Sequence, residues 1–257
     1  MSIYQLNFEG KNKIETAIGR IKMYEPPEGY YLAFSGGKDS ITLYDLATKS
    51  GVKFDTHYSQ TGIDPPELVK FIRKNYPNVI FEPHTESMFS LITRNGLPTR
   101  RARFCCKHLK EQGGIGRFLL TGIRWAESPR RRMRNLTEVS GCYQKTKKFL
   151  HPIIDWSDEE VWEYIKKKQL RYCELYNNGF KRLGCILCPM ATEKQRKFQS
   201  EQYPKFTQAY KNAIGRLLAR GRDCDKRWNG DVEKMFNWWI KNESAGKYDF
   251  QETMFTD

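Results

Sequence analysis

The segment that most constrains this chain is the hexapeptide SGGKDS at 35–40, which separates an apolar run over 30–34 from a helical pattern over 41–47. Together these pieces predict a strand, a tight turn and an amphipathic helix. Adjacent glycines allow positive φ, and a helix N-terminus attracts anions, so the turn predicts a phosphate site. The spacing is not that of a Walker A loop, which excludes the β/γ-phosphate cradle of P-loop proteins. Turn chemistry alone also fits an ordinary capped turn between strand and helix.

Strand and helix patterns alternate along the first half of the chain. We predict further strands over 52–58, 78–82 and 117–123, and a proline-initiated helix over 67–72. Such alternation predicts an α/β fold with a doubly wound, mostly parallel sheet. Ligands of these sheets bind beyond the carboxyl ends of the strands, which is where the glycine turn would lie.

Helical patterns dominate the rest of the chain. Ser157 and Glu160 have the spacing of a capping box, and from 190 onward Lys, Arg and aromatic residues recur at helical spacing. We therefore expect two domains. The first, 1–189, is a nucleotide-binding α/β domain with an N-terminal helix, and the second, 190–257, is a basic, aromatic-rich helical C-terminal unit.

The composition is strongly basic. Lys and Arg number 44 against 30 Asp and Glu, which gives the 257-residue chain a formal net charge of +14. Such a charge attracts a polyphosphate or a nucleic-acid backbone, although scattered lysines also serve solubility. No apolar run approaches the length of a membrane span, and the N-terminal residues do not resemble a secretory signal, so we expect a cytoplasmic protein with no membrane partner.

The seven cysteines are an odd number in a chain without a secretory signal, which argues against a disulfide framework. Cys105 and Cys106 are adjacent, and Cys185 and Cys188 form a C-x-x-C pair. Two pairs supply four thiolates, the number that either tetrahedral zinc or a 4Fe-4S cluster requires, and spacing does not separate these metals. Three cysteines without partner spacing are expected to be buried thiols: Cys142, Cys173 and Cys224.

A basic stretch follows the predicted strand over 117–123, beginning with Arg124 directly after the Thr-Gly pair. Guanidinium groups bind phosphate or sulfate oxygens bidentately, and this strand end would face the same crevice as the glycine turn. Arg124 is the strongest single candidate for substrate binding. The sequence does not tell which of Arg130 to Arg134 face the site, and a basic run is also typical of a solvated face.

These motifs, in this order, resemble the phosphoadenosine phosphosulfate reductase-like family of the adenine nucleotide α-hydrolases over about 30–190. The SGGKDS turn looks like the family's pyrophosphate-binding loop, and the Thr-Gly-x-Arg segment looks like the one that closes over the substrate. Adjacent cysteines followed by Gly-Cys-x-x-Cys resemble the cluster ligands of iron-sulfur adenylyl sulfate reductases. The adenylating proteins of DNA phosphorothioation systems are similar in both respects. Trp156 and Trp162, which match a Pro-x-x-x-Trp and Val-Trp segment, are expected in the core.

The resemblance implies three sets of site residues. The expected catalytic residues are Lys38, Asp39 and Arg124. The expected nucleotide-binding residues are Ser35, Gly36, Gly37, Lys38, Asp39, Ser40, Thr61, Gly62, Glu67, Gly122, Arg124, Ser128 and Arg131. The expected ligands of a 4Fe-4S cluster, with zinc as the alternative, are Cys105, Cys106, Cys185 and Cys188. The substrate would be ATP or an adenylyl sulfate with Mg²⁺.

The chain departs from the reductases at its end. They carry a nucleophilic cysteine in a Glu-Cys-Gly-x-His segment, whereas this tail has only Cys224 between two aspartates, which raise a thiol's pKa. Our first hypothesis is therefore an enzyme that adenylates an acceptor, in preparation for sulfur transfer, with nucleic acid as a candidate acceptor. The alternatives are a thioredoxin-dependent reductase that releases sulfite, and a nucleic-acid-binding subunit with a non-hydrolysing nucleotide site. In each case we expect a homo-oligomer or a subunit of a complex, with a sulfur donor protein or thioredoxin as a partner.

Overall fold

The computed structural model describes residues 2–6, 10–127, 139–141 and 146–241. Its sheet has six strands in the order β3-β2-β1-β4-β6-β5. The strands are β1 Tyr30–Ala33, β2 Phe54–Gln60, β3 Ile80–Pro83, β4 Phe118–Leu120, β5 Val139–Gly141 and β6 Lys148–Leu150. Every neighbouring pair is parallel except β5 with β6, so the predicted mostly parallel α/β sheet is confirmed.

From β1 to β3, strands and helices alternate as the sequence predicts. The helices are α1 Lys13–Met23, α2 Lys38–Ser50, α3 Pro66–Asn75, α4 Met88–Asn95, α5 Phe104–Leu109, α7 Asp158–Lys167, α8 Glu193–Gln202, α9 Pro204–Leu218 and α10 Val232–Lys241. The described residues also form the short 3-10 helices η1 Trp125–Glu127, η2 Glu174–Tyr176 and η3 Asp223–Trp228. No helix in the described part of the chain has the length and apolarity that crossing a bilayer requires.

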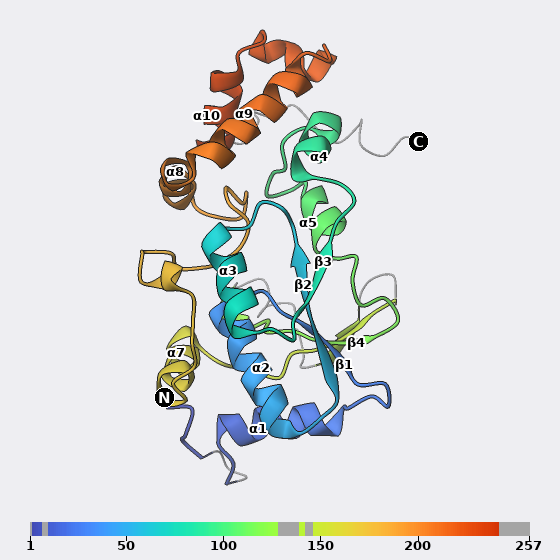
Figure 1. Cartoon of the computed structure of the whole chain (residues 1–257), viewed down its shortest axis with the longest axis vertical. Coiled ribbons are helices and arrows are strands. Elements are labelled where there is room, and N and C mark those ends of the chain that lie inside the picture. The colour runs from blue at the N-terminus through green and yellow to red at the C-terminus, as the bar shows by residue number, and fades with distance from the viewer. Residues whose placement is uncertain (1, 7–9, 128–138, 142–145, 242–257) are drawn as a thin grey trace. The chain divides into compact units, whose positions relative to one another are not determined.

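The described chain divides into two compact units. The first unit comprises Met1–Glu86 and Cys106–Cys185, and the second comprises Ser87–Cys105 and Ile186–Asp257. The first unit therefore holds the whole sheet. The second unit is helical, and in it α4 packs against α9, which also contacts α8 and α10 (Figure 1). The expected boundary between 189 and 190 remains a prediction.

Strand β1 is the centre of the first unit. It pairs with β2 and β4, so that Leu32 lies opposite Thr56 on one side and Leu120 on the other. Leu32 is completely buried, as is Leu43 on α2. Helix α2 contacts both α1 and α7 in this unit (Figure 1). Burial of this apolar surface fixes the start of α2 at the carboxyl end of the central strand.

Local signals account for where two of these helices begin. Helix α7 starts after Ser157, whose side chain accepts from the Glu160 backbone N–H while Glu160 accepts from the Ser157 backbone N–H, so the predicted capping box is confirmed. Helix α3 begins at Pro66, as the proline signal predicts. The short β5–β6 pair and helix α4 were not among the elements predicted from the sequence.

A charged cluster stabilises one part of the sheet. His57 on β2 contacts the carboxylates of Asp55 and Glu82, the latter at 2.8 Å from Nδ1. Arg117 donates from Nη2 to Asp55 at 2.5 Å, and the Tyr31 hydroxyl donates to Glu82 at 2.8 Å. Burial alone would raise the pKa of Asp55, but Arg117 and His57 outweigh it and lower the pKa below its usual range. We assign this cluster a structural role.

Candidate active site

The turn between β1 and α2 requires glycine at position 36. Gly36 has a φ of +69°, and a Cβ there would lie 2.8 Å from side-chain carbons of Leu68 and Ile72 on α3. Any other residue would be strained in its backbone and would also clash with α3. Ser35 and Ser40 close the turn, with the Ser40 hydroxyl donating to the Gly37 carbonyl at 2.9 Å. The hexapeptide thus forms the predicted strand-turn-helix connection.

Helix α2 begins without a side-chain cap from its N-cap residue. Its N-cap is Gly37, which has no side chain to cap the helix. The Lys38 backbone N–H donates instead to the Tyr176 hydroxyl at 2.9 Å. Because a helix N-terminus attracts anions, this is the position where a phosphate oxygen would accept the same hydrogen bond.

Two cations and two carboxylates meet beside this helix start. Arg124 donates from Nε to Asp39 at 2.7 Å and from Nη2 to Asp158 at 2.6 Å. The Lys38 ammonium lies 2.9 Å from Asp158 and 3.1 Å from Asp39. Each cation therefore contacts both carboxylates, and each carboxylate contacts both cations. The predicted residues Lys38, Asp39 and Arg124 are brought together as expected.

The degree of burial differs sharply within this cluster. The Arg124 side chain is 1% exposed and donates a further hydrogen bond to the Trp156 carbonyl, whereas the Asp158 side chain is 60% exposed. A direct contact of Arg124 with a substrate phosphate, which the sequence predicts, would require the guanidinium to leave these partners. Lys38, with a side chain 10% exposed, is the cation nearer to solvent.

The charges in the cluster shift each other's protonation equilibria. Burial alone would lower the pKa of Arg124, but Asp39 and Asp158 raise it above its ordinary value. Burial alone would raise the pKa of Asp158, but hydrogen bonds from Lys38 and Arg124 lower it below its usual range. Arg124 and Asp158 are therefore both charged at neutral pH.

Gly122 explains how Arg124 reaches the start of α2. A Cβ on Gly122 would lie 3.1 Å from the backbone carbon and oxygen of Asp39, closer than side chains normally approach backbone. Glycine therefore allows the end of β4 to lie directly against α2. The Arg124 side chain, two residues on, then meets Asp39.

Asp158 and Tyr176 belong to this site, and the sequence analysis missed both. Asp158 is the first residue of α7 and looked like part of an ordinary acidic helix start. Tyr176 packs edge-to-face against Trp162 with ring centroids 5.0 Å apart, and burial raises the pKa of its hydroxyl, which stays protonated. Trp156 is buried, as predicted, while Trp162 is half-buried and supports Tyr176.

The second predicted nucleotide segment forms a turn in the same unit. The Thr61 backbone N–H donates to the Asp64 side chain at 3.0 Å, and the Thr61 hydroxyl lies 3.7 Å from the Cys185 sulfur. Gly62 has a φ of +74° and is exposed. Glu67 is exposed in the first turn of α3. Their binding of a nucleotide remains a prediction.

Several predicted residues lie outside the described part of the chain. Ser128, Arg131 and the other arginines of 130–134 fall in the range 128–138, and Cys142 falls in 142–145. The side chain of Cys224 is also not described. Cys173 is buried, and this burial raises its thiol pKa, so the predicted buried thiol is confirmed.

The four predicted metal ligands are partly exposed thiols. Each pair is divided by the unit boundary, because Cys106 and Cys185 belong to the first unit and Cys105 and Cys188 to the second. Four thiols are a donor set whose chemistry fits an iron-sulfur cluster or zinc. Among the residues that the structure describes, no three His, Cys, Asp or Glu side chains are grouped as metal ligands.

The fold and the site together define a class of protein. A parallel sheet with a glycine turn after its central strand, and cations gathered at the helix start, is the arrangement of nucleotide-binding enzymes of the α-hydrolase type. Residues 29–191 match the phosphoadenosine phosphosulfate reductase domain, so the chain belongs to that family. The family resemblance inferred from the motifs is confirmed.

Individual relatives agree with this assignment. The uncharacterized proteins MJ0066 and MJ0973 of Methanocaldococcus jannaschii are each 28% identical, and the alignments cover 84% and 77% of this chain. They cover only 48% and 50% of those relatives, so this chain spans about half their length. An adenosine 5'-phosphosulfate reductase of Staphylococcus epidermidis is 28% identical over 71% of this chain and 79% of that protein.

A solved structure supports the fold. The phosphoadenylyl-sulfate reductase of Candida auris, solved as a phosphate complex, superposes with a TM-score of 0.51 at 18% identity. The superposition covers 72% of this chain and 98% of that chain. At this identity the similarity shows a shared fold.

Proposed function

We propose that this chain binds ATP at the turn over 35–40 and promotes attack of an acceptor oxygen on the α-phosphorus. The new phosphorus-oxygen bond forms as the bond to the bridging oxygen breaks, pyrophosphate leaves and the acceptor proton passes to solvent. The observation that carries the proposal is the convergence of Lys38 and Arg124 beside a helix start whose N-cap residue is glycine. Triphosphate, as its magnesium complex, carries the charge that this site attracts.

Lys38 is the residue that we expect to contact the phosphates. Its ammonium is held by Asp39 and Asp158 at the start of α2, and phosphate oxygens would replace part of this carboxylate coordination. The positive charge then stabilises the pyrophosphate as it leaves. Arg124 acts as a positioning residue, because its buried guanidinium holds Asp39 and Asp158 in place around the ammonium.

A second candidate function is reduction of an adenylyl sulfate with release of sulfite. The observation that favours it is that several relatives are named adenosine 5'-phosphosulfate reductase. A reductase would need a thiolate as nucleophile and a dithiol protein such as thioredoxin to regenerate it.

For the cysteine pairs the proposal is ligation of a 4Fe-4S cluster by Cys105, Cys106, Cys185 and Cys188, with zinc as the alternative. Such a cluster would supply electron transfer or sulfur relay. Purification without oxygen should give a protein with a broad visible absorbance and bound iron. Cys188→Ser should lower both the absorbance and the iron content. Cys173→Ser is the matched control, because that buried thiol is not a proposed ligand. A colourless zinc protein would exclude the cluster.

The deciding experiment compares products. The full chain, purified without oxygen, is incubated separately with ATP, adenosine 5'-phosphosulfate and its 3'-phosphorylated form, and pyrophosphate and sulfite are measured. Pyrophosphate from ATP that is abolished by Lys38→Ala supports the proposal. Sulfite from a sulfonucleotide without ATP turnover would establish the second candidate in its place.

A further inference from the structure

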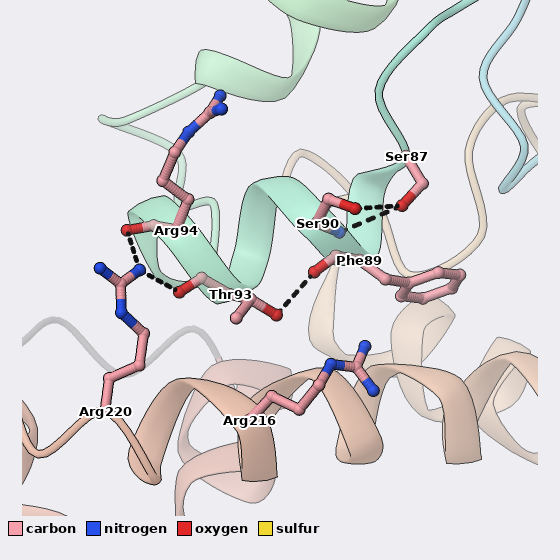
Figure 2. Close-up of a pocket in the computed structure, with 7 residues that line it drawn as sticks. All are labelled: Ser87, Phe89, Ser90, Thr93, Arg94, Arg216 and Arg220. Atoms are coloured by element: carbon pink, nitrogen blue, oxygen red, sulfur yellow. Dashed lines mark hydrogen bonds between the residues drawn. The ribbon is translucent and has the colours of Figure 1, made fainter.

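The second unit contains a groove between α4 and α9, whereas the turn over 35–40 belongs to the first unit. The groove encloses about 330 Å³. The polar residues that line it are Ser87, Ser90, Thr93, Arg94, Arg216 and Arg220. The lining contains three arginines and no carboxylate. Figure 2 shows Arg216 extending from α9 toward α4, whereas the Arg94 side chain points away from α9.

Arg216 on α9 and Arg220 just after α9 have no carboxylate partner among the residues that the structure describes. Arg220 donates from Nη1 to the carbonyl oxygens of Thr93 and Arg94, at 2.8 and 3.3 Å (Figure 2). These neutral acceptors fix the guanidinium without cancelling its charge. Arg216 is exposed, and neither it nor Arg220 forms an ion pair with any residue that the structure describes. Arg222, by contrast, is paired with Asp225 at 2.8 Å.

Hydroxyl groups lie in the same groove at the start of α4. The Ser87 side chain accepts from the Ser90 backbone N–H at 3.1 Å, and the two hydroxyls lie 2.9 Å apart. Both serines are exposed. Hydroxyls and guanidinium groups together are the donors that bind the oxygens of a phosphodiester.

An aromatic ring completes the lining. Phe89 is half-buried and packs edge-to-face on Tyr210, with ring centroids 5.4 Å apart. A ring held in this way offers a surface on which a base can stack. We infer that this groove, defined by Ser87, Phe89, Ser90, Arg216 and Arg220, binds the phosphodiester backbone of a single-stranded nucleic acid. A groove of this volume admits one nucleotide of a flexible strand but not the rigid surface of a duplex.

This inference extends the proposed function, because it supplies a place on the chain where a nucleic-acid acceptor would be held. Its physical basis is separate, since binding at the groove requires no nucleotide chemistry. If the chain does not turn over ATP, the groove can still bind nucleic acid. If the groove does not bind nucleic acid, the chain can still turn over ATP.

The test measures binding of fluorescein-labelled 12-nucleotide single strands to the full chain by fluorescence anisotropy. One arm uses DNA and the other RNA of the same sequence, which distinguishes the two sources of phosphodiester. We expect Arg216→Glu to weaken binding about tenfold or more and Arg216→Lys to keep it within about threefold. Arg216 is exposed on α9, so both variants should keep the parent thermal midpoint.

Lys205→Glu is the matched control, because it makes the same charge change on an exposed residue of the same helix outside the groove. An equal loss from Lys205→Glu and Arg216→Glu would overturn the inference in favour of diffuse attraction. Duplex DNA that binds as tightly as either single strand, or no binding of any oligonucleotide, would also overturn it. Pyrophosphate release from ATP alone should be the same in Arg216→Glu as in the parent.

Discussion

The nucleotide turn and the α4–α9 groove both present cations, but they hold them in opposite ways. At the turn, Lys38 and Arg124 are almost buried and share two carboxylates. In the groove, Arg220 is fixed by neutral carbonyl oxygens and Arg216 extends into solvent. Carboxylates neutralise the cations of the first site, whereas the described lining of the groove contains no carboxylate.

This difference predicts two kinds of anion recognition. An anion at the turn must compete with Asp39 and Asp158 for the same cations, so it binds well only if it also matches the helix start in shape. A phosphate that enters the groove meets arginines with no carboxylate partner among the described residues. Nucleotide binding should therefore depend on geometry, and oligonucleotide binding should depend on salt.

The largest expected effect is that of Lys38→Ala on ATP turnover. Removing the ammonium takes away the charge that stabilises the leaving pyrophosphate, so we expect a loss of at least about 100-fold. Lys49→Ala is the control, because Lys49 lies at the other end of α2 in a surface pair with Asp45. Oligonucleotide affinity should be unchanged in both variants. If Lys38→Ala also weakened oligonucleotide binding, the two sites would not be separate.

The next largest effect is that of Gly122→Ala, which tests geometry without changing charge. The added methyl group would lie 3.1 Å from the Asp39 backbone and push the end of β4 from α2. We expect ATP affinity to fall about tenfold, with a loss of stability of about 1–3 kcal/mol. Gly19→Ala is the control, because a Cβ there meets no atom within 4 Å and should stabilise α1. Equal behaviour of the two variants would show that the close approach is unimportant.

The salt dependence of ligand affinity should distinguish the two sites most directly. If two phosphates contact Arg216 and Arg220, raising salt from about 50 to about 200 mM should weaken single-strand binding about sevenfold. ATP affinity should change less, because carboxylates already screen Lys38 and Arg124. The measurement is a titration of each ligand at four salt concentrations. If ATP affinity fell more steeply with salt than single-strand affinity did, the proposed difference between the two sites would be wrong.

Asp158→Asn should have two smaller effects, an increase in ATP affinity and a decrease in stability. The amide keeps the shape but no longer competes with phosphate for Lys38, so ATP should bind about threefold more tightly. Stability should fall by about 1 kcal/mol, because Arg124 loses a charged partner that is itself well exposed. Isothermal titration and urea unfolding measure the two quantities. Weaker ATP binding would mean that Asp158 orients Lys38 rather than competing for it.

The smallest effect is the loss of stability in acid. Asp55 and Asp158 have pKa values below the ordinary value of about 4, so they stabilise the fold above that pH and lose this contribution as the pH falls through their folded pKa values. Each partly exposed carboxylate should contribute less than about 1 kcal/mol. Urea unfolding between pH 7 and 3 checks this, and Asp55→Asn should flatten the decline. Stability that fell between pH 7 and 5 would point to other groups.

The sheet and the nucleotide turn could be predicted because their signals are local. Strand β1, the glycines and the start of α2 lie in one short segment, and the proline before α3 marks its start directly. Strands β5 and β6 have three residues each, too few for a periodic pattern. Helix α4 was missed although Met88, Leu91 and Ile92 have helical spacing.

The partners within the site could not be predicted, because they come from distant segments. Asp158 reaches Arg124 across 34 residues of sequence, and Tyr176 reaches the Lys38 backbone across 138. Nothing in the residues around Asp158 distinguishes an ion-pair partner from a helix-start carboxylate. The same holds for the groove, whose two sides only the tertiary fold brings together.

The discontinuous second unit has a consequence for synthesis of the chain. Helix α4 is made early, but it packs on α9, with Phe89 against Tyr210, and α9 emerges from the ribosome much later. During that interval the nascent chain carries helix α4 without its packing partner, while the strands of the first unit can already pair. Because one unit is built from two separated segments, we expect chains that stop before α9 to aggregate or to require chaperones.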